Sequence, residues 1–217
     1  MIDSKYKHII WDWNGTLFDD AWLCLSVMNG ILSRRGMMPM TPERYETIFD
    51  FPVMDYYRRA GFDFAVDPFE QLSDEFIEGY YDRFGDCKLR SGTVEALDAG
   101  QENGLTMSIL SAMEQNALEK MMEHFELSDY FVTVDGLQNH HAAGKVEIAK
   151  KWIAESEFDP SELVYIGDTV HDYEVAEAIG IDCYLIHSGH HSVERLAALG
   201  VPIINKLSDL YRLNGNG

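Results

Sequence analysis

Short apolar runs alternate with segments of helical periodicity over most of this chain. Apolar runs typical of buried strands lie at residues 9–11, 105–110, 131–134, 163–166 and 181–186, with a shorter one at 202–204. Between them, apolar residues recur at helical spacing over residues 93–103, 114–125, 145–153 and 171–179. Strands that alternate with helices in this way predict βαβ units and a parallel sheet, so the fold class is α/β.

One segment departs from this alternation. Residues 19–89 show only helical patterns, over residues 21–35, from Thr41 onward, over 53–60 and over 69–80. Thr41 followed by Pro42 is a helix start signal, and Gly61 is a stop. We therefore predict a core of residues 1–18 and 90–217, interrupted after its first strand by an all-helical segment, residues 19–89. Such an insertion acts either as a lid or as a passive packing block.

Composition narrows the classes of partner. The 217 residues carry 37 acidic and 17 basic side chains, a formal charge of −20 that repels nucleic acid and anionic membranes. No charged and apolar leader and no apolar run of membrane-spanning length is present, so we expect neither export nor a membrane span. Three widely spaced cysteines indicate no disulfide framework, and we expect a cytoplasmic protein.

Candidate catalytic residues follow the predicted strands. Asp12 ends the first apolar run, Ser111 the second, and Asp168 the fourth, with Asp172 four residues later and Lys145 after the third run. Carboxyl ends of parallel strands meet at one edge of a sheet, where ligands bind. A carboxylate there is a nucleophile for a phosphoryl group, and Asp12 with Asp168 offers oxygen ligands to Mg²⁺. Ser111 in a strand-to-helix turn and Lys145 would bind the phosphate.

These motifs resemble those of the haloacid dehalogenase-like hydrolases, and within them the phosphoglycolate-phosphatase-like members. Residues 12–16 (Asp-Trp-Asn-Gly-Thr) match the first family motif, Ser111 the second, Lys145 the third, and residues 167–172 the fourth. The resemblance implies a three-layer Rossmann-like core with a helical cap, and Mg²⁺ as cofactor. The residue roles that it implies are nucleophile and metal ligand for Asp12; catalysis for Ser111 and Lys145; phosphate binding for Asn14, Gly15, Ser111, Ala112 and Lys145; and metal binding for Asn14 (through its carbonyl), Asp168 and Asp172.

Asn14 departs from the family pattern. Phosphatases of the family usually have an aspartate there as general acid and base, and an amide cannot exchange a proton near neutral pH. His171, inside the fourth motif, is a candidate substitute. We expect the other loop histidines to be solvated rather than catalytic: His140, His141, His187, His190 and His191.

The leading hypothesis is a Mg²⁺-dependent phosphatase that hydrolyses a small phosphorylated metabolite, phosphoglycolate-like or a sugar phosphate, through an aspartyl-phosphate intermediate. The alternative is a phospho-ligand binding or regulatory protein whose catalysis is weakened by Asn14; a dehalogenase, which would not need the acid pair at Asp168 and Asp172, ranks third. We expect a monomer or a homodimer. Four arginines either bind a charged group of the substrate or pair with surplus acids: Arg34, Arg35, Arg58 and Arg59. We expect the tyrosine pairs at 56–57 and 80–81 to be packing residues.

Overall fold

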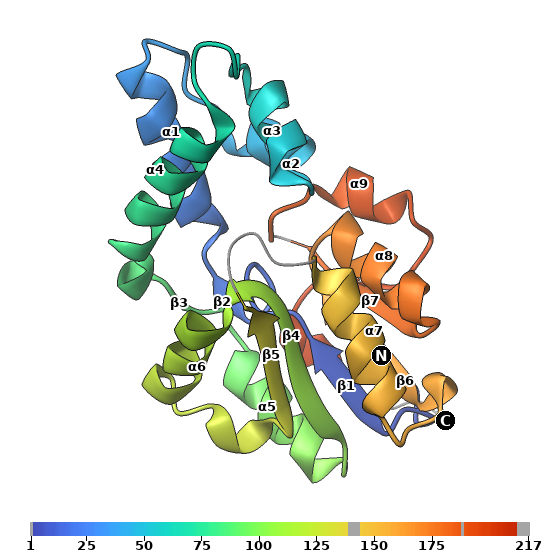
Figure 1. Cartoon of the computed structure of the whole chain (residues 1–217). Helices are drawn as coiled ribbons and strands as arrows, with labels where there is room; N and C mark the ends of the chain where they lie inside the picture. The colour runs from blue at the N-terminus through green and yellow to red at the C-terminus, as the bar shows by residue number, and fades with distance from the viewer. Residues whose placement is uncertain (1, 139–143, 188, 212–217) are drawn as a thin grey trace.

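A parallel sheet organises the chain, seen here in a computed structural model that describes residues 2–138, 144–187 and 189–211 (Figure 1). Within those residues the main sheet has six parallel strands in the order β5-β4-β1-β6-β7-β8. The strands are β1 (His8–Trp11), β4 (Thr106–Glu114), β5 (Thr133–Leu137), β6 (Leu163–Gly167), β7 (Asp182–Ile186) and β8 (Ile203–Ile204). This arrangement confirms the predicted α/β class and the Rossmann-like sheet.

Both faces of the sheet are covered by helices, so the protein has three layers. Alternate residues of β1 enter different cores: Ile9 and Trp11 pack on one side and Ile10 on the other, all fully buried. Helices α5 (Thr93–Glu102) and α6 (Gln115–His124) contribute to the first core. The second core receives α7 (Lys145–Glu155), α8 (Val170–Ile179) and the short α9 (Val193–Ala197). The strand ends of this central sheet are therefore held rigidly from two sides.

The segment between residues 19 and 89 is mainly helical, and its helices begin and end where the sequence predicts. They are α1 (Ala21–Arg34), α2 (Pro42–Ile48), α3 (Val53–Ala60) and α4 (Phe69–Tyr81). The Thr41 side chain caps α2 by accepting from the Arg44 amide at 3.3 Å, and Gly61 ends α3 at φ +111°, a backbone angle that favours glycine. In Figure 1 these helices lie beyond one end of the sheet.

The expectation that this segment contains no strand was wrong at its two ends. Strands β2 (Phe18–Asp19) and β3 (Lys88–Leu89) form a separate antiparallel pair, with Phe18 opposite Leu89. Two residues are too few to give a recognisable period. The pairing brings the entry and exit of the helical segment side by side, so a single narrow connection joins it to the sheet (Figure 1).

The second strand also ends later than predicted. β4 continues past Leu110 with an irregularity in its pairing and includes Ser111, and α6 begins only at Gln115. Ser111 therefore lies within a strand, not in a strand-to-helix turn. The first amides of α6 are instead capped by Glu114, which accepts from the amides of Asn116 and Ala117. No anion site made of those amides faces Ser111.

Contacts from the core also hold the helical segment. Arg195 of α9 donates to the carbonyl oxygens of Glu46 and Phe49, at 3.2 and 2.6 Å, and forms an ion pair with Asp50 at 3.2 Å. It thereby satisfies carbonyl groups at the end of α2 that lack partners within the helix. A further bond joins the Tyr45 hydroxyl of α2 to His190 at 2.7 Å. The helical segment is thus held both at its connection and near α2.

Candidate functional site

Three carboxylates meet beyond the carboxyl ends of β1 and β6. Asp12 directly follows β1, Asp168 follows β6, and Asp172 lies in the first turn of α8. Each offers an oxygen atom, and the three atoms lie within 4.8 Å of one another. All three side chains are buried. The structure thus brings together the acids that the sequence singled out.

Lys145, the first residue of α7, supplies a positive charge to this group. Its Nζ atom contacts Asp12 Oδ1 and lies 2.5 Å from Asp172 Oδ1, and the side chain is only 3% exposed. Burial opposes charge on this ammonium, but the carboxylates of Asp12 and Asp172 raise the pKa of Lys145 well above its ordinary value. Lys145 is therefore an ammonium group in direct contact with the candidate nucleophile.

Negative charge nevertheless exceeds positive charge in this group. Burial and the neighbouring carboxylates raise the pKa of Asp12, and burial raises that of Asp168 to about 6. When all three carboxyl groups are ionised, as metal binding requires, they exceed the one ammonium by two negative charges among the four residues. Oxygen donors with this charge surplus fit a hard divalent cation such as Mg²⁺.

The backbone holds Asp168 closely. Gly15, at φ +71°, and Gly189 approach its carboxylate so tightly that a Cβ atom at either position would overlap it. The His190 amide donates to Asp168 Oδ2 at 2.5 Å, and the Thr16 hydroxyl lies 3.1 Å from Oδ1. The same hydroxyl lies 3.2 Å from Asp12 Oδ2. The glycine turn after β1 therefore serves to bring backbone against the acids.

Asp172 has a different environment. Its Oδ2 atom accepts from the amides of Asp168 and Thr169, at 3.1 and 2.9 Å, and from the Thr169 hydroxyl at 2.7 Å. Burial alone would favour the neutral acid, but Lys145 and these bonds lower the pKa of Asp172. Asp172 is thus a fixed anion that holds both the start of α8 and the Lys145 ammonium.

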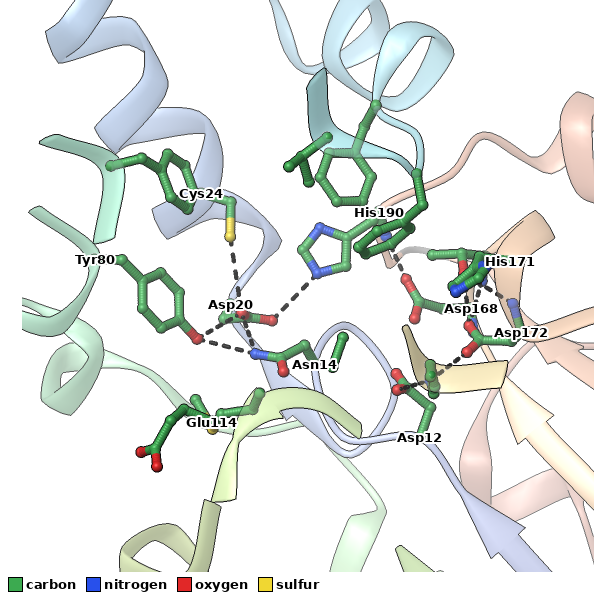
Figure 2. Close-up of a pocket in the computed structure, with 18 of the residues that line it drawn as sticks. Asp12, Asn14, Asp20, Cys24, Tyr80, Glu114, Asp168, His171, Asp172 and His190 are labelled. Atoms are coloured by element: carbon green, nitrogen blue, oxygen red, sulfur yellow. Dashed lines mark hydrogen bonds and ion pairs between the residues drawn. The ribbon is translucent and has the colours of Figure 1, made fainter. Parts of the chain in front are cut away.

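Asn14 belongs to a second polar cluster, which Figure 2 shows beside the acids. Its amide nitrogen donates to Asp20 Oδ2 at 2.7 Å and lies 3.0 Å from the Tyr80 hydroxyl. Its side-chain oxygen accepts from Ser111 Oγ at 3.4 Å, and Ser111 in turn accepts from the Met113 amide at 3.0 Å. The amide is therefore held in one orientation by partners on both sides.

Asp20 is the centre of that cluster and is fully buried. Its Oδ1 atom accepts from the Gly15 amide at 2.9 Å, and its Oδ2 atom accepts from Tyr80 at 2.8 Å as well as from Asn14. Burial raises the pKa of this carboxyl, but the bonds from His190, Asn14 and Tyr80 outweigh it, and the pKa of Asp20 is lowered. Asp20 is an ionised group inside the protein.

His190 compensates that charge. Its Nε2 atom lies 3.4 Å from Asp20 Oδ1, its Nδ1 atom bonds Tyr45, and its ring stacks on Phe49 with centroids 4.9 Å apart. Burial disfavours the charged ring, but the bond to Asp20 raises the pKa of His190 to about 9. His190 is therefore an imidazolium group near neutral pH.

The expectation of solvated loop histidines was wrong for two of them. His190 and His191 are 4% and 1% exposed, because the loop after β7 folds back over the site. His191 accepts from the Val170 amide at 3.0 Å, and burial lowers its pKa to about 3. His187 is partly buried, and His140 and His141 lie outside the described residues.

A cavity of about 210 Å³ lies between these clusters and the helical segment. Asp12, Asn14, Ala112 and Lys145 line it, as do the acids. His171 also lines it, with its ring tilted against that of Phe51 at a centroid distance of 4.9 Å and its Nδ1 atom 3.3 Å from Glu174. This arrangement brings the candidate nucleophile, the ammonium and the candidate acid–base histidine to one space.

The arginines of the helical segment are not at this cavity. Arg35 makes a two-pronged bond to Glu75 and a bond to Asp67, Arg34 also pairs with Glu75, and the other two pair with Asp55 and Asp50. Of the two alternatives predicted for these four arginines, pairing with surplus acids is therefore the correct one. The tyrosine prediction holds for the buried pair at 56–57 but not at 80–81, where both residues line the cavity.

Sequence reasoning missed Asp20, Tyr80 and His190. Asp20 precedes a helix, as a capping residue would, and makes no capping bond, while Tyr80 sits in an ordinary helical repeat. Nothing in the spacing of these residues indicates that they meet. The one signal in the sequence was the amide at Asn14 in place of a carboxylate, because a polar side chain beside the site needs hydrogen-bond partners.

Comparison with known proteins agrees with this geometry. Phosphoglycolate phosphatase of Synechococcus elongatus is 23% identical over 194 residues, which cover 88% of each chain. Tyrosine-protein kinase PtkA of Mycobacterium tuberculosis is 22% identical over 214 residues, covering 94% of this chain and 70% of that protein. A haloacid dehalogenase-like hydrolase from Streptococcus pneumoniae, SP0104, shares the fold with a TM-score of 0.82 and 16% identity, over 96% of this chain and 98% of that one.

The family model described as haloacid dehalogenase-like hydrolase matches residues 9–186, a span that includes every predicted site residue. This match confirms the resemblance inferred from the motifs. The chain belongs to the haloacid dehalogenase-like hydrolase family.

Proposed function

We propose that the protein is a Mg²⁺-dependent phosphatase that hydrolyses a small phosphorylated metabolite through an aspartyl phosphate on Asp12. The observation that carries this proposal is the contact of the buried Asp12 carboxylate with the Lys145 ammonium beside two further carboxylates. Membership of a hydrolase family supports it, as does the name of the cyanobacterial relative, a phosphoglycolate phosphatase.

In the first step an Asp12 oxygen would attack the phosphorus atom, and the bond from phosphorus to the leaving oxygen would break. The electron pair of that bond leaves with the alcohol or aryl oxygen, and an acyl phosphate forms on Asp12. Lys145 stays in contact with Asp12 and neutralises charge on the transferred group. Asp172 keeps Lys145 in place through its own ion pair.

Asp12, Asp168 and the Asn14 carbonyl would hold the Mg²⁺ ion, and Asp172 would support the site. When bound, the ion supplies neutralisation of the phosphoryl oxygens. In the second step water attacks the acyl phosphate and frees the Asp12 carboxylate. A carboxyl base for that water is missing at position 14, because Asn14 carries an amide bonded to Asp20.

The missing base is the reason to test a second function, phospho-ligand binding without efficient turnover. A phospho-ligand binding protein on this fold would retain the cation and phosphate sites but turn substrate over slowly or not at all. The specific observation in its favour is the fixed Asn14 amide, held by Asp20, Tyr80 and Ser111. Among the described helices none is long and apolar enough to cross a lipid bilayer.

We also propose that residues 19–89 act as a cap that opens and closes over the cavity, hinged at residues 17–20 and 88–92. The paired strands β2 and β3 form a narrow connection there, and Arg195 and His190 contact the segment in its present position.

We expect phosphate release to depend on a divalent cation, since two negative charges in the site lack a partner. Excess chelator should abolish release from an ester, and added Mg²⁺ should restore it. Calorimetry of Mg²⁺ binding to the resting protein gives a second readout that does not require turnover. Undiminished activity in excess chelator would rule out the metal.

We expect Asp12→Asn to lower turnover by more than about 10⁴-fold, because an amide of nearly the same size cannot form an acyl phosphate. The fold should persist, which circular dichroism would check. Asp129→Asn is the matched control, since this carboxylate is exposed and lies outside both the site and the proposed hinge. Comparable turnover in Asp12→Asn and in the control would assign the nucleophile to another residue.

We expect Arg195→Gln to release α2 from the core, because the variant loses the ion pair to Asp50 and weakens two bonds to carbonyl groups. Amide hydrogen exchange in residues 42–50 should accelerate by about tenfold, the equivalent of ~1.4 kcal/mol. Arg58→Gln is the control, since Arg58 pairs with Asp55 inside α3. If the amides of residues 42–50 exchanged equally fast in both variants, Arg195 would not be what holds α2 against the core.

We expect Asn14→Asp alone to give no gain in turnover of alkyl phosphates, because the new carboxylate would face Asp20 at the present 2.7 Å bond. The paired change Asn14→Asp with Asp20→Asn keeps one amide and one carboxylate in contact. It should raise alkyl phosphate turnover by at least about tenfold, part of the 10² to 10⁴ that proton transfer typically contributes.

The comparison for the paired variant is Asp20→Asn alone, which carries the same loss of charge at position 20. If the two variants turned over alkyl phosphates equally, position 14 would have no role in proton transfer. His171→Gln in each background would then show whether the histidine provides it.

A further inference from the structure

One part of the cavity lining, called the wall below, is apolar and largely aromatic. It is built from the loop between α2 and α3, from the first residue of α3, from α4 and from the end of β4. Its members are Phe49, Phe51, Val53, Phe76, Ile77, Tyr81 and Met113. The group attached to a bound phosphate would therefore be surrounded by rings and aliphatic side chains.

The cations that line the cavity are already engaged. Lys145 contacts Asp12 and Asp172, and both ring nitrogens of His190 have partners, Asp20 and Tyr45. His171, which also lines the cavity, has its Nδ1 atom 3.3 Å from the Glu174 carboxylate. Arg34, Arg35, Arg58 and Arg59 pair with carboxylates, and no arginine is among the described residues that line the cavity. A carboxylate on the leaving group would therefore be buried among these residues without a cationic partner, which is costly.

The carboxylate next to this wall, that of Glu114, binds amides of α6 instead of facing the cavity's acids. Glu114 lines the cavity, but its oxygens cap α6, and in Figure 2 they point away from the acids. A sugar would need hydrogen-bonding groups around its hydroxyls, and the wall offers rings and aliphatic chains instead. The lining thus favours a leaving group that is uncharged and apolar.

Apart from His171, whose Nδ1 atom lies 3.3 Å from Glu174, the proton donors for the leaving group are also restricted. Asn14 is an amide, and the two oxygens of Asp20 accept from Gly15, Tyr80, Asn14 and His190. Each carboxylate oxygen has two lone pairs, so Asp20 has no position left for a substrate proton. An aryl oxygen, with a pKa of about 10 in a phenol, leaves without a proton more readily than an alkyl oxygen does.

We propose that the site is selective for phosphate monoesters of uncharged aromatic alcohols, and that it discriminates against carboxylate-bearing esters such as phosphoglycolate. The juxtaposition that carries this inference is a phosphoryl site of acids and Lys145 against a wall of Phe49, Phe51, Phe76 and Ile77. It rests on the proposed phosphatase function and narrows the substrate class of that same site.

The test compares substrates that differ by one charge. Phenyl phosphate and 4-carboxyphenyl phosphate share a ring, and the carboxylated phenol is the better leaving group, so chemistry alone would favour it. We expect kcat/KM for phenyl phosphate to be at least about tenfold higher, and that for phosphoglycolate to be lower than both, since an unpaired buried charge costs more than the ~1.4 kcal/mol of one decade.

A variant tests the wall itself. Ile77→Lys adds a cation to a partly buried lining position and should invert the preference toward 4-carboxyphenyl phosphate. Val94→Lys on α5 adds the same charge at a residue 40% exposed outside the cavity lining and should leave the preference unchanged. Faster turnover of phosphoglycolate or a sugar phosphate than of phenyl phosphate in the unmodified protein would overturn the inference while leaving the phosphatase function intact.

Binding of phosphonates that cannot be hydrolysed tests the inference independently of turnover. Phenylphosphonate should bind at least about tenfold more tightly than phosphonoacetate by calorimetry, and Ile77→Lys should reverse that order. If no ester were hydrolysed but this order held, the phosphatase function would fail and the ligand class would stand. The opposite order of binding would overturn the ligand class whatever the turnover.

Discussion

The contact between Lys145 and Asp12 is the interaction on which the site depends. An ammonium and three carboxylates are buried together, and burying charge is costly unless each group has partners. The fold offsets this cost by placing the partners together. Because β1 and β6 are neighbouring strands, Asp12 and Asp168 lie side by side at their ends. Because α7 packs against α8, Lys145 reaches Asp172. Removal of one member would leave an unpaired charge inside the protein.

A second buried ion pair joins the core to the helical segment. Asp20 lies at the start of α1, His190 lies on the loop after β7, and Tyr45 and Tyr80 approach them from α2 and α4. The carboxylate that the family usually has at position 14 is thus replaced here by an amide bonded to a carboxylate six residues later. The local charge is similar, but the carboxylate is engaged in holding the segment and is withdrawn from proton transfer.

Most of the sheet, the helices and the four acidic and basic site residues were predictable, because each depends on local pattern. Apolar runs indicated the strands, Thr41 and Gly61 marked helix ends, and Asp12, Lys145, Asp168 and Asp172 each follow a strand. The pair of β2 and β3 was missed because two-residue strands carry no period. Ser111 was misplaced because β4 continues through an irregular pairing that no apolar alternation marks. The burial of His190 depends on a loop that folds onto Asp20, a contact between residues 170 positions apart.

The two clusters together explain why an apolar wall is compatible with this charged site. The Lys145 ammonium of the phosphoryl site is paired with carboxylates of that site, and the charge on Asp20 is balanced by His190. Neither cluster directs a free cation toward the wall, so the wall interacts with a ligand through packing and ring contacts. Selectivity would then come from the cost of burying an unpaired group rather than from a dedicated recognition residue, and it would change with a single lysine at the wall. The residues that hold the helical segment and those that choose the substrate would meet at Phe49, whose carbonyl accepts from Arg195 and whose ring stacks on His190 and lines the cavity. A change at Phe49 would therefore affect both the position of the segment and the choice of substrate.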